Sequence, residues 1–310
     1  MSLRFIRRNS ELFRHDKWNI GIVHEPIDAF LEPAARPNVS WVPPPEPDRF
    51  LADPFLVTRN KRAYIMCEEY DYKSMKGRIM SFELENEKLT SKARVAIEMP
   101  FHMSYPFCFE HEGDVYCIPE TRQIRQIALY AVEEFPSKWT RVATLIDNFA
   151  GADGTVFQHD GSWWLTSSIG GRYSSLRLMV WHSSKLLGPW RPHTQNPVKT
   201  DNSSTRPAGT PFTHRGSLYR PAQDCSKRYG GRIVLNRVVR LTPTEFKEER
   251  AAVIEPFDGP YRDGIHTISA GGSITLIDGN RRVFSKNTVL KEYPILARRT
   301  LVGLLSRLRV

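Results

Sequence analysis

The feature that most constrains the fold of this chain is an internal repeat of about 50 residues, a period typical of sheet-based repeat proteins. Five segments each begin with a short polar motif, continue as an apolar run, turn at charged or glycine residues, and return as a second run with a polar end. The residues that open the five segments are Asp53, Ser104, Asp153, Arg206 and Gly264. Because a four-stranded antiparallel blade has this length, the sequence predicts an all-β chain folded as a five-bladed β-propeller.

The remainder of each repeat supplies the outer strands of a blade. Runs such as RIMSFELE and IALYAVEEF mix apolar and polar residues over short stretches rather than at helical spacing. The run WNIGIVHEP precedes the first repeat. We expect it to close the ring as a strand of blade five, because an open ring would expose sheet edges that favour aggregation. The predicted parts are a basic N-terminal segment at 1–16, the propeller at 17–286 and a basic tail at 287–310.

The C-terminal tail departs from the strand pattern and predicts a short helix, because its leucines recur at helical spacing while arginines occupy the rest of the wheel. The residues concerned are Leu301, Leu304, Leu305 and Leu308 with Arg298, Arg299, Arg307 and Arg309. This helix packs on the propeller or lies on an anionic membrane surface, and the sequence leaves both open. Vesicle flotation with and without residues 294–310 separates the two interpretations.

Charge and cysteine content restrict the partners of the chain. The 44 Lys and Arg residues exceed the 34 Asp and Glu residues, a balance that favours anionic partners, but no groove-reading motif supports nucleic-acid binding and we expect none. The four cysteines form no closely spaced pairs, so we expect buried thiols, with no metal and no cofactor. Because no run resembles a signal peptide or a membrane span, the sequence predicts a cytoplasmic location, with peripheral membrane contact through the tail as the alternative.

In a propeller the innermost strands converge on the axis, so residues that open the repeats are expected to form one site. These residues are Asp53, Ser104, Tyr105, Asp153, Arg206 and His266. The polar ends of the second strands form a second expected ring of Glu68, Glu69, Glu120 and Asp224. Carboxyl groups collected in a funnel suit glycosidic bond cleavage, which needs one acid and one base or nucleophile.

Each of these residues also has a structural interpretation. Asp53 and Asp153 occupy matched repeat positions, which favours function, although an aspartate in a turn often caps backbone N–H groups. Arg206 or Arg220 could bind a carboxylate or phosphate, or form a salt bridge to a neighbouring blade. His266 and His102 suit hydrogen bonding or acid and base chemistry, or a purely structural role.

Several motifs resemble a known family. They are LADPF at 51–55, IPET at 118–121, RPAG at 206–209, LYRPAQDCSKRYG at 218–230 and GIHT at 264–267. With them the chain resembles, over roughly residues 17–285, the N-terminal domain of the plant glucosamine inositolphosphorylceramide transferases and its bacterial relatives. That domain is similar in turn to the five-bladed furanosidase superfamily, which includes the family 43 glycoside hydrolases.

The resemblance implies roles for particular residues. Asp53 matches the blade-one base of family 43, and Asp153 matches the blade-three residue that orients and tunes pKa. The blade-four opening carries Arg206 where that family has its general acid, and Gly154 follows Asp153 where proline is usual. The proton donor would then be Glu120 or Asp224. The resemblance assigns glycosyl transfer in the plant proteins to a different domain, and we do not carry that activity over.

Three hypotheses result. The first is a glycoside hydrolase-like or glycosyl-transferring enzyme acting on a glycan or glycoconjugate in the funnel, with Asp53 as base or nucleophile, Asp153 as orienting residue and Glu120 or Asp224 as donor. The residues expected to bind substrate are Ser104, Tyr105, Arg206, Arg220, Gln223 and His266. The second is a non-catalytic glycan- or glycolipid-binding module. The third is a scaffold in polysaccharide biosynthesis, whose role would survive alteration of every funnel carboxylate.

Overall fold

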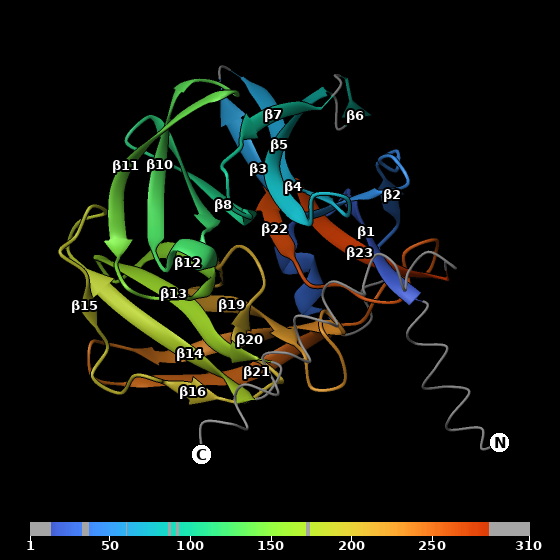
Figure 1. Cartoon of the computed structure of the whole chain (residues 1–310). Helices are drawn as coiled ribbons and strands as arrows, with labels where there is room; N and C mark the ends of the chain where they lie inside the picture. The colour runs from blue at the N-terminus through green and yellow to red at the C-terminus, as the bar shows by residue number, and fades with distance from the viewer. Residues whose placement is uncertain are drawn as a thin grey trace, which may run out of the picture.

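The computed structural model describes residues 14–284 apart from 33–36, 60, 86–87, 91–92 and 172–173. Within these residues the chain forms five antiparallel sheets arranged around a common centre, which confirms the predicted five-bladed propeller (Figure 1). The predicted C-terminal helix lies outside the described residues, as does its membrane contact. Among the described residues, no helix has the length and apolar character of a membrane-spanning segment.

The blades follow one another in chain order. Blade one contains β3 (Arg49–Arg59), β4 (Arg62–Asp71), β5 (Lys76–Glu85), β6 (Lys88–Leu89) and β7 (Arg94–Ile97). Blade two contains β8 (Ser104–His111), β9 (Asp114–Glu120), β10 (Ile127–Glu134) and β11 (Lys138–Ile146). Blade three contains β12 (Ala152–His159), β13 (Ser162–Gly171), β14 (Ser174–Ser183), β15 (Arg191–Pro192) and β16 (Lys199–Thr200). Blade four contains β17 (Arg206–Pro207), β18 (Phe212–His214), β19 (Ser217–Asp224), β20 (Arg232–Leu241) and β21 (Phe246–Ile254).

Blade five joins the two ends of the described chain. It contains β22 (Ile268–Gly271), β23 (Ile274–Phe284), β1 (Arg14–Val23) and β2 (Val39–Trp41). Strand β1 runs antiparallel to β23, with Val23 opposite Thr275 and Gly21 opposite Ile277, and the blue and red ribbons lie side by side in Figure 1. The prediction that an N-terminal strand closes the ring is therefore confirmed. Two short 3-10 helices, η1 (Ile27–Leu31) and η2 (Arg122–Ile124), lie in connections.

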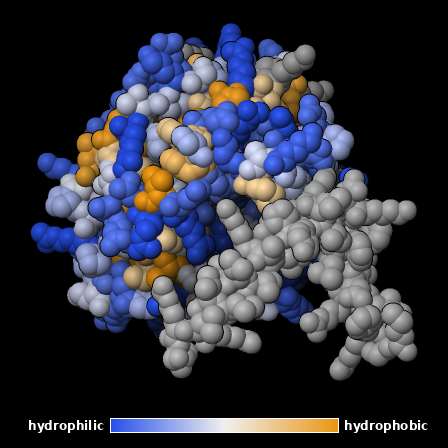
Figure 2. Space-filling model, in the orientation of Figure 1, coloured by the Kyte–Doolittle hydropathy of each residue, from blue (hydrophilic) through white to orange (hydrophobic). Residues whose placement is uncertain are grey.

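The core lies between the blades. Strand β4 buries Ile65, Met66 and Cys67 in succession, because both faces of a blade pack against its neighbours and the usual alternation is lost. Cys108 and Cys117 lie opposite each other in β8 and β9 and, like Cys67, are free and buried. On the face shown in Figure 2 hydrophilic residues predominate and hydrophobic ones form small groups. The strand pattern thus directs apolar side chains into the contacts between blades.

The innermost strands of blades one, two and three share one irregularity. Their register shifts immediately after Ala52, Ser104 and Ala152. The next residues, Asp53, Tyr105 and Asp153, have φ angles of 52°, 44° and 56°. A shift of this kind is a β-bulge, which redirects a side chain. Positive φ is costly for residues other than glycine and is concentrated at functional sites, so the three bulges mark the axis as a candidate site.

Blades four and five approach each other backbone to backbone at Gly209. Its φ is 123°, and a β-carbon placed there would lie 1.7 Å from the carbonyl oxygen of Ile268. The N–H of Ile268 donates to the carbonyl of Ala208 at 2.8 Å, and that of Thr210 donates to the carbonyl of Ile268 at 3.1 Å. A side chain at position 209 would therefore separate the two blades beside the axis.

We expect Gly209→Ala to lower the free energy of unfolding by at least about 3 kcal/mol, because the methyl group meets backbone that cannot move aside. Gly216→Ala is the matched control: φ is 77° but nothing lies within 4 Å of its added carbon, so the expected loss is the conformational cost of about 1–2 kcal/mol. Urea unfolding of both variants measures the difference. Equal losses would contradict the close approach of blades four and five.

Candidate active site

The backbone N–H of each bulge residue is bound by a carboxylate from the preceding blade. Asp53 N donates to Asp278 Oδ2 at 3.1 Å, and Tyr105 N donates to Asp53 Oδ2 at 3.2 Å. Asp153 N donates to Glu120 Oε2 at 3.3 Å. The bulges therefore hold their strained conformation through charge-assisted or buried hydrogen bonds to carboxyl groups. The same contacts bring carboxyl groups of blades five, one and two to the axis.

Asp153 is held by two side chains of blade four. Arg206 donates from Nε to Asp153 Oδ2 at 2.5 Å and from Nη2 to Oδ1 at 3.1 Å, a bidentate pair. Gln223 adds a bond from Nε2 to Oδ2 at 3.0 Å. The predicted residues Asp153, Arg206 and Gln223 therefore meet, and the arginine that opens blade four neutralises the blade-three carboxylate.

Glu120 is nearly buried at the end of β9 and has a less complete set of partners. Arg206 Nη2 lies 3.8 Å from its Oε2, the oxygen that accepts from Asp153 N. Burial raises the pKa of Glu120 to about 8, the Asp153 charge adds to the increase, and Arg206 opposes it. Glu120 is therefore mostly protonated at neutral pH and can donate a proton.

Asp53 has a different environment, formed by residues that directly precede the first strand of blade five. The Thr267 hydroxyl donates to its Oδ1 at 2.5 Å, and His266 Nε2 lies 3.6 Å from the same oxygen. Burial raises the pKa of Asp53 to about 6, His266 opposes this increase, and the charges of Asp278 and Asp153 add to it. Asp53 is therefore mostly ionised at neutral pH and can accept a proton.

Blade five contributes His266, whose ring packs against two aromatic side chains. His266 Nδ1 lies 2.5 Å from Asp278 Oδ2. Trp18 of β1 stacks on the imidazole with ring centroids 4.0 Å apart. Tyr229, from the loop between β19 and β20, meets the imidazole edge-on with centroids 5.3 Å apart. The ring is thereby fixed beside Asp53.

The remaining predicted site residues have structural partners. Tyr105 is fully buried, and its hydroxyl pairs with Thr155 at 2.9 Å and accepts from Gly209 N at 2.8 Å. Ser104, nearly buried, lies opposite Glu120 in the β8–β9 register. The side chain of Tyr105 therefore lies in the core, bonded to blades three and four, and does not face solvent.

Arg220 and Asp224 are engaged in ion pairs of their own. Arg220, 2% exposed, binds Glu248 through Nε at 2.9 Å and Nη2 at 2.7 Å. This is a salt bridge within blade four, whereas the alternative considered from the sequence was one to a neighbouring blade. Asp224 accepts from Arg232 Nε at 2.8 Å and from Ser226 N at 2.9 Å. Although burial opposes them, these hydrogen bonds hold the pKa of Asp224 below its ordinary value. Asp224 is thus in the form that cannot donate a proton.

Two residues of the site, Asp278 and Tyr229, have no role in the sequence-based prediction. Asp278 lies within β23, one residue beyond Ile277, where the pairing of β23 with β22 stops, so the repeat register is a signal for it. Tyr229 is 47% exposed, with the Arg206 guanidinium carbon 5.0 Å from its ring centroid. Glu68, which the sequence placed in the second ring, lies opposite Ala52 and is buried. Burial together with the Asp53 charge raises its pKa well above its ordinary value.

One group of side chains has the composition of a cation site. Donor atoms of Asp53, His266 and Asp278 lie within 4.8 Å of one another. Both oxygens of Asp53 and of Asp278 already accept hydrogen bonds, from Thr267, Tyr105, His266 and Asp53. Internal bonding therefore accounts for this group without an ion.

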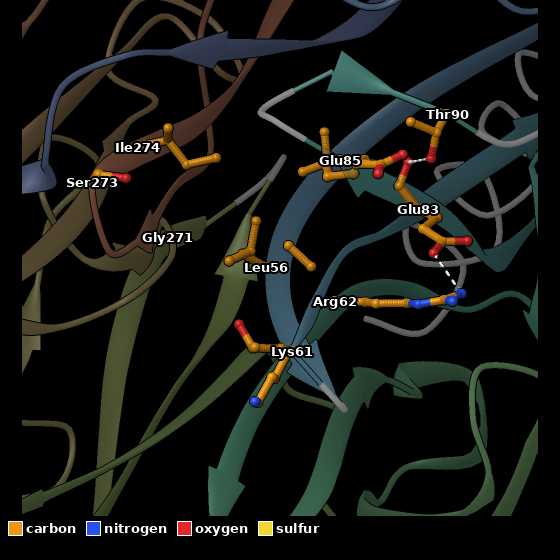
Figure 3. Close-up of a pocket in the computed structure, with 12 residues that line it drawn as sticks. Leu56, Lys61, Arg62, Glu83, Glu85, Thr90, Gly271, Ser273 and Ile274 are labelled. Atoms are coloured by element: carbon orange, nitrogen blue, oxygen red, sulfur yellow. Dashed lines mark hydrogen bonds and ion pairs between the residues drawn. The ribbon is translucent and has the colours of Figure 1, made fainter.

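A pocket of about 640 Å³ lies apart from these residues (Figure 3). It lies at the hairpin turns of blades one and five, where Leu56 and Ile274 line it together with an ion pair of Arg62 and Glu83 at 3.0 Å. None of the carboxyl groups at the axis lines it. The pocket therefore does not coincide with the candidate active site.

Comparison with protein families identifies relatives of this chain. The family model described as glucosamine inositolphosphorylceramide transferase 1, N-terminal, matches residues 35–257. Glucosamine inositolphosphorylceramide transferase 1 of Oryza sativa subsp. japonica is 32% identical over 268 residues, 80% of this chain and 36% of the relative. The Arabidopsis thaliana protein of the same name is 31% identical over 255 residues, 76% and 33%. The chain thus spans about a third of the length of these relatives.

Solved structures show the same fold at low sequence identity. Zg3597, a family 117 glycoside hydrolase of Zobellia galactanivorans, superposes with a TM-score of 0.53 at 15% identity, covering 90% of this chain and 93% of that one. The GH43 protein BlXynB of Bacillus licheniformis has a TM-score of 0.51 at 18% identity, covering 66% and 44%. At these identities the likeness shows a shared fold.

We expect Glu120→Gln to raise the melting temperature at pH 9 and to change it little at pH 5. The folded-state pKa of about 8 exceeds the ordinary 4.5, so stability from the protonated carboxyl is present below pH 4.5 and is lost as the pH rises towards 8. A neutral amide removes that loss and keeps an acceptor for Asp153 N. Glu112→Gln, whose side chain is 83% exposed, is the control. A lower melting temperature for Glu120→Gln at pH 9 would show that Glu120 is stably ionised.

Proposed function

The chain belongs to the family of the N-terminal domain of glucosamine inositolphosphorylceramide transferase 1, and we propose that the carboxyl groups at its axis hydrolyse a glycosidic bond in a glycan or glycoconjugate. Family membership and the five-bladed fold make it a carbohydrate-related protein. The neighbours in the fold include glycoside hydrolases of families 43 and 117. Hydrolysis is a property of those neighbours, and the proposal for this chain rests on its own carboxyl groups.

The observation that carries the proposal is that the bulge contacts bring the carboxyl groups of Asp53 and Glu120 to the axis in different environments: Asp53 beside Thr267 and His266, and Glu120 with one backbone donor and a more distant arginine. Their pKa values differ accordingly. Asp53 has a pKa of about 6 and Glu120 a pKa of about 8. Near pH 7 one is mostly a carboxylate and the other mostly a carboxylic acid, as glycoside hydrolysis requires. Glu120 would protonate the leaving oxygen while Asp53 deprotonates the attacking water or attacks the anomeric carbon directly.

Asp153 and Arg206 support this pair. The Asp153 charge adds to the raised pKa of Glu120, and Arg206 fixes the orientation of Asp153 by its bidentate contact. Of the two donors that the sequence left open, Glu120 is therefore favoured over Asp224, whose carboxylate is held ionised by Arg232 and Ser226. We propose that Asp153 is an orienting residue and that Gln223 and Arg206 hold it in place.

We expect a bell-shaped dependence of kcat/KM on pH with limbs near 6 and 8, measured on a panel of p-nitrophenyl and alkyl glycosides. Activity rises as Asp53 ionises and falls as Glu120 loses its proton. Asp53→Asn should lower kcat by about 10²–10⁴-fold on every substrate. Glu120→Gln should lower it far more on alkyl glycosides than on p-nitrophenyl glycosides, because p-nitrophenolate leaves without protonation.

The control for this experiment is Asp224→Asn, which should retain most of the activity. Loss of turnover in Asp224→Asn with retention in Glu120→Gln would transfer the donor role to Asp224. A fully active Asp53→Asn variant would exclude Asp53 as base or nucleophile.

A non-catalytic glycan-binding module is the second candidate function, favoured by Arg206 at the position where the resemblance implies a general acid. Tyr229, half exposed against the Arg206 guanidinium, offers an aromatic surface of the kind on which sugar rings stack. In this case the wild type would bind a glycan without converting it.

Under either function we expect Tyr229→Ala to weaken glycan binding by about tenfold or more, because a stacking surface beside the carboxyl groups is removed. Titration calorimetry with oligosaccharides in the Asp53→Asn background separates binding from turnover. Tyr219→Ala is the aromatic control, since Tyr219 stacks on Phe212 within blade four. Unchanged affinity in Tyr229→Ala would remove Tyr229 from the binding surface.

A further inference from the structure

Asp278 has no part in the acid and base pair described above, yet it contacts both Asp53 and His266. We propose that Asp278 is a positioning residue that acts through His266 on Asp53, so that blade five sets the protonation state of the base in blade one. The inference rests on the proposed role of Asp53 as base. The backbone hydrogen bonds of Asp278 could only hold the chain in place, whereas its contact with the His266 ring would control the charge beside Asp53.

The contacts of Asp278 are almost all with the elements that present Asp53 and His266. The carboxylate is fully buried. Its Oδ1 accepts from the backbone N–H groups of His266 at 2.9 Å and Thr267 at 3.0 Å, and its Oδ2 accepts from that of Asp53 at 3.1 Å. Oδ2 also lies 2.5 Å from His266 Nδ1. One carboxylate thus joins the bulge of blade one to the innermost segment of blade five.

This arrangement fixes which ring nitrogen faces the base. Nδ1 lies at ion-pair distance from Asp278 Oδ2 without the alignment of a hydrogen bond, and Nε2 lies 3.6 Å from Asp53 Oδ1, so the ring stands between the two carboxylates. Trp18 stacks on the ring at an interplanar angle of 22°, and Gly230 lies so close to Trp18 that an added β-carbon would approach it to 2.5 Å. The imidazole therefore cannot turn away from its position between the two carboxylates.

The charges around His266 favour its imidazolium form. Asp278 on β23 and Asp53 on β3 face the ring, Asp153 on β12 acts at longer range, and Trp18 and Tyr229 cover it. Burial lowers the pKa of His266, but the carboxylates more than offset this and the pKa is raised. The stacked indole adds a cation–π contribution in the same direction. An imidazolium beside Asp53 favours its ionised form. By favouring the imidazolium, Asp278 thus favours the carboxylate form of Asp53.

The test begins with a measurement that needs no turnover. Asp278→Asn keeps the size of the side chain and one oxygen acceptor while removing its charge. In protein labelled at histidine and aspartate, we expect NMR titration to show the pKa of His266 falling by about one unit or more. The pKa of Asp53 should rise above 6, because the lost imidazolium outweighs the removed charge of Asp278. The acid limb of the pH–rate profile should move upward with it.

The His266→Gln background gives the diagnostic result. Without the imidazole, Asp278→Asn only removes a like charge near Asp53, so it should lower the pKa of Asp53 instead of raising it. The effect of one substitution thus changes sign between the two backgrounds, whereas a merely structural role would give the same sign in both. Asp201→Asn is the control, since Asp201 Oδ1 accepts from Ser203 N and Ser204 N at 2.7 Å without a histidine partner.

The proposal is overturned if Asp278→Asn leaves the pKa of His266 unchanged, or if the sign of its effect on Asp53 is the same in both backgrounds. Should Asp278→Asn not fold, the wild-type titration of His266 and the His266→Gln variant decide together: a His266 pKa at or below its ordinary 6.5, or an unchanged pKa of Asp53 in His266→Gln, overturns the proposal, and a raised pKa of both groups supports it. Absence of turnover in the wild type on every glycoside would contradict the proposed function while the two titrations still decide the role of Asp278.

Discussion

The hydrogen bonds from bulge N–H groups to carboxyl groups of the preceding blade are the interactions on which the centre of this propeller depends. A residue other than glycine at positive φ costs about 1–3 kcal/mol, and here three such residues lie at the axis. Asp278, Asp53 and Glu120 each accept from the next bulge in the ring, so blades five, one, two and three are linked in series. The groups that stabilise the inner strands are therefore the same groups that could perform chemistry.

The number of donors around each carboxyl group distinguishes one from another. Asp278 accepts three backbone N–H groups and faces an imidazole, and Asp153 accepts from a bidentate arginine and a glutamine. Glu120 accepts one backbone N–H and lies at 3.8 Å from the shared arginine. A buried carboxylate is stable only where donors replace water, and burial of Glu120 with so few donors raises its pKa. The architecture of the ring thus produces acids and bases of different strength from similar side chains.

The repeat in the sequence predicts most of the fold because blade strands are local in sequence and alternate with short turns. Matched repeat positions likewise lead to Asp53 and Asp153, which the structure places in equivalent bulges. Partnerships between side chains are harder to predict, because they depend on packing across strands. From the sequence Arg220 is expected to bind substrate, but in the structure it binds Glu248 of β21. Asp278 lies inside β23, in a blade that the N-terminal strands β1 and β2 complete, so its contacts depend on segments from both ends of the described chain.

Arg206 stands at the position of the blade-four acid that the resemblance implies, and a second carboxyl group, Glu120, could take the role of that acid. The resemblance to family 43 implies a carboxylic acid at the start of blade four, where this chain has a guanidinium that pairs with Asp153. The close, bidentate contact of this guanidinium is with Asp153. Glu120, at the longer distance, keeps a pKa near 8 because burial and the Asp153 charge exceed the effect of the arginine. Replacing the blade-four acid by arginine therefore leaves a protonated carboxyl group at the axis, contributed by blade two.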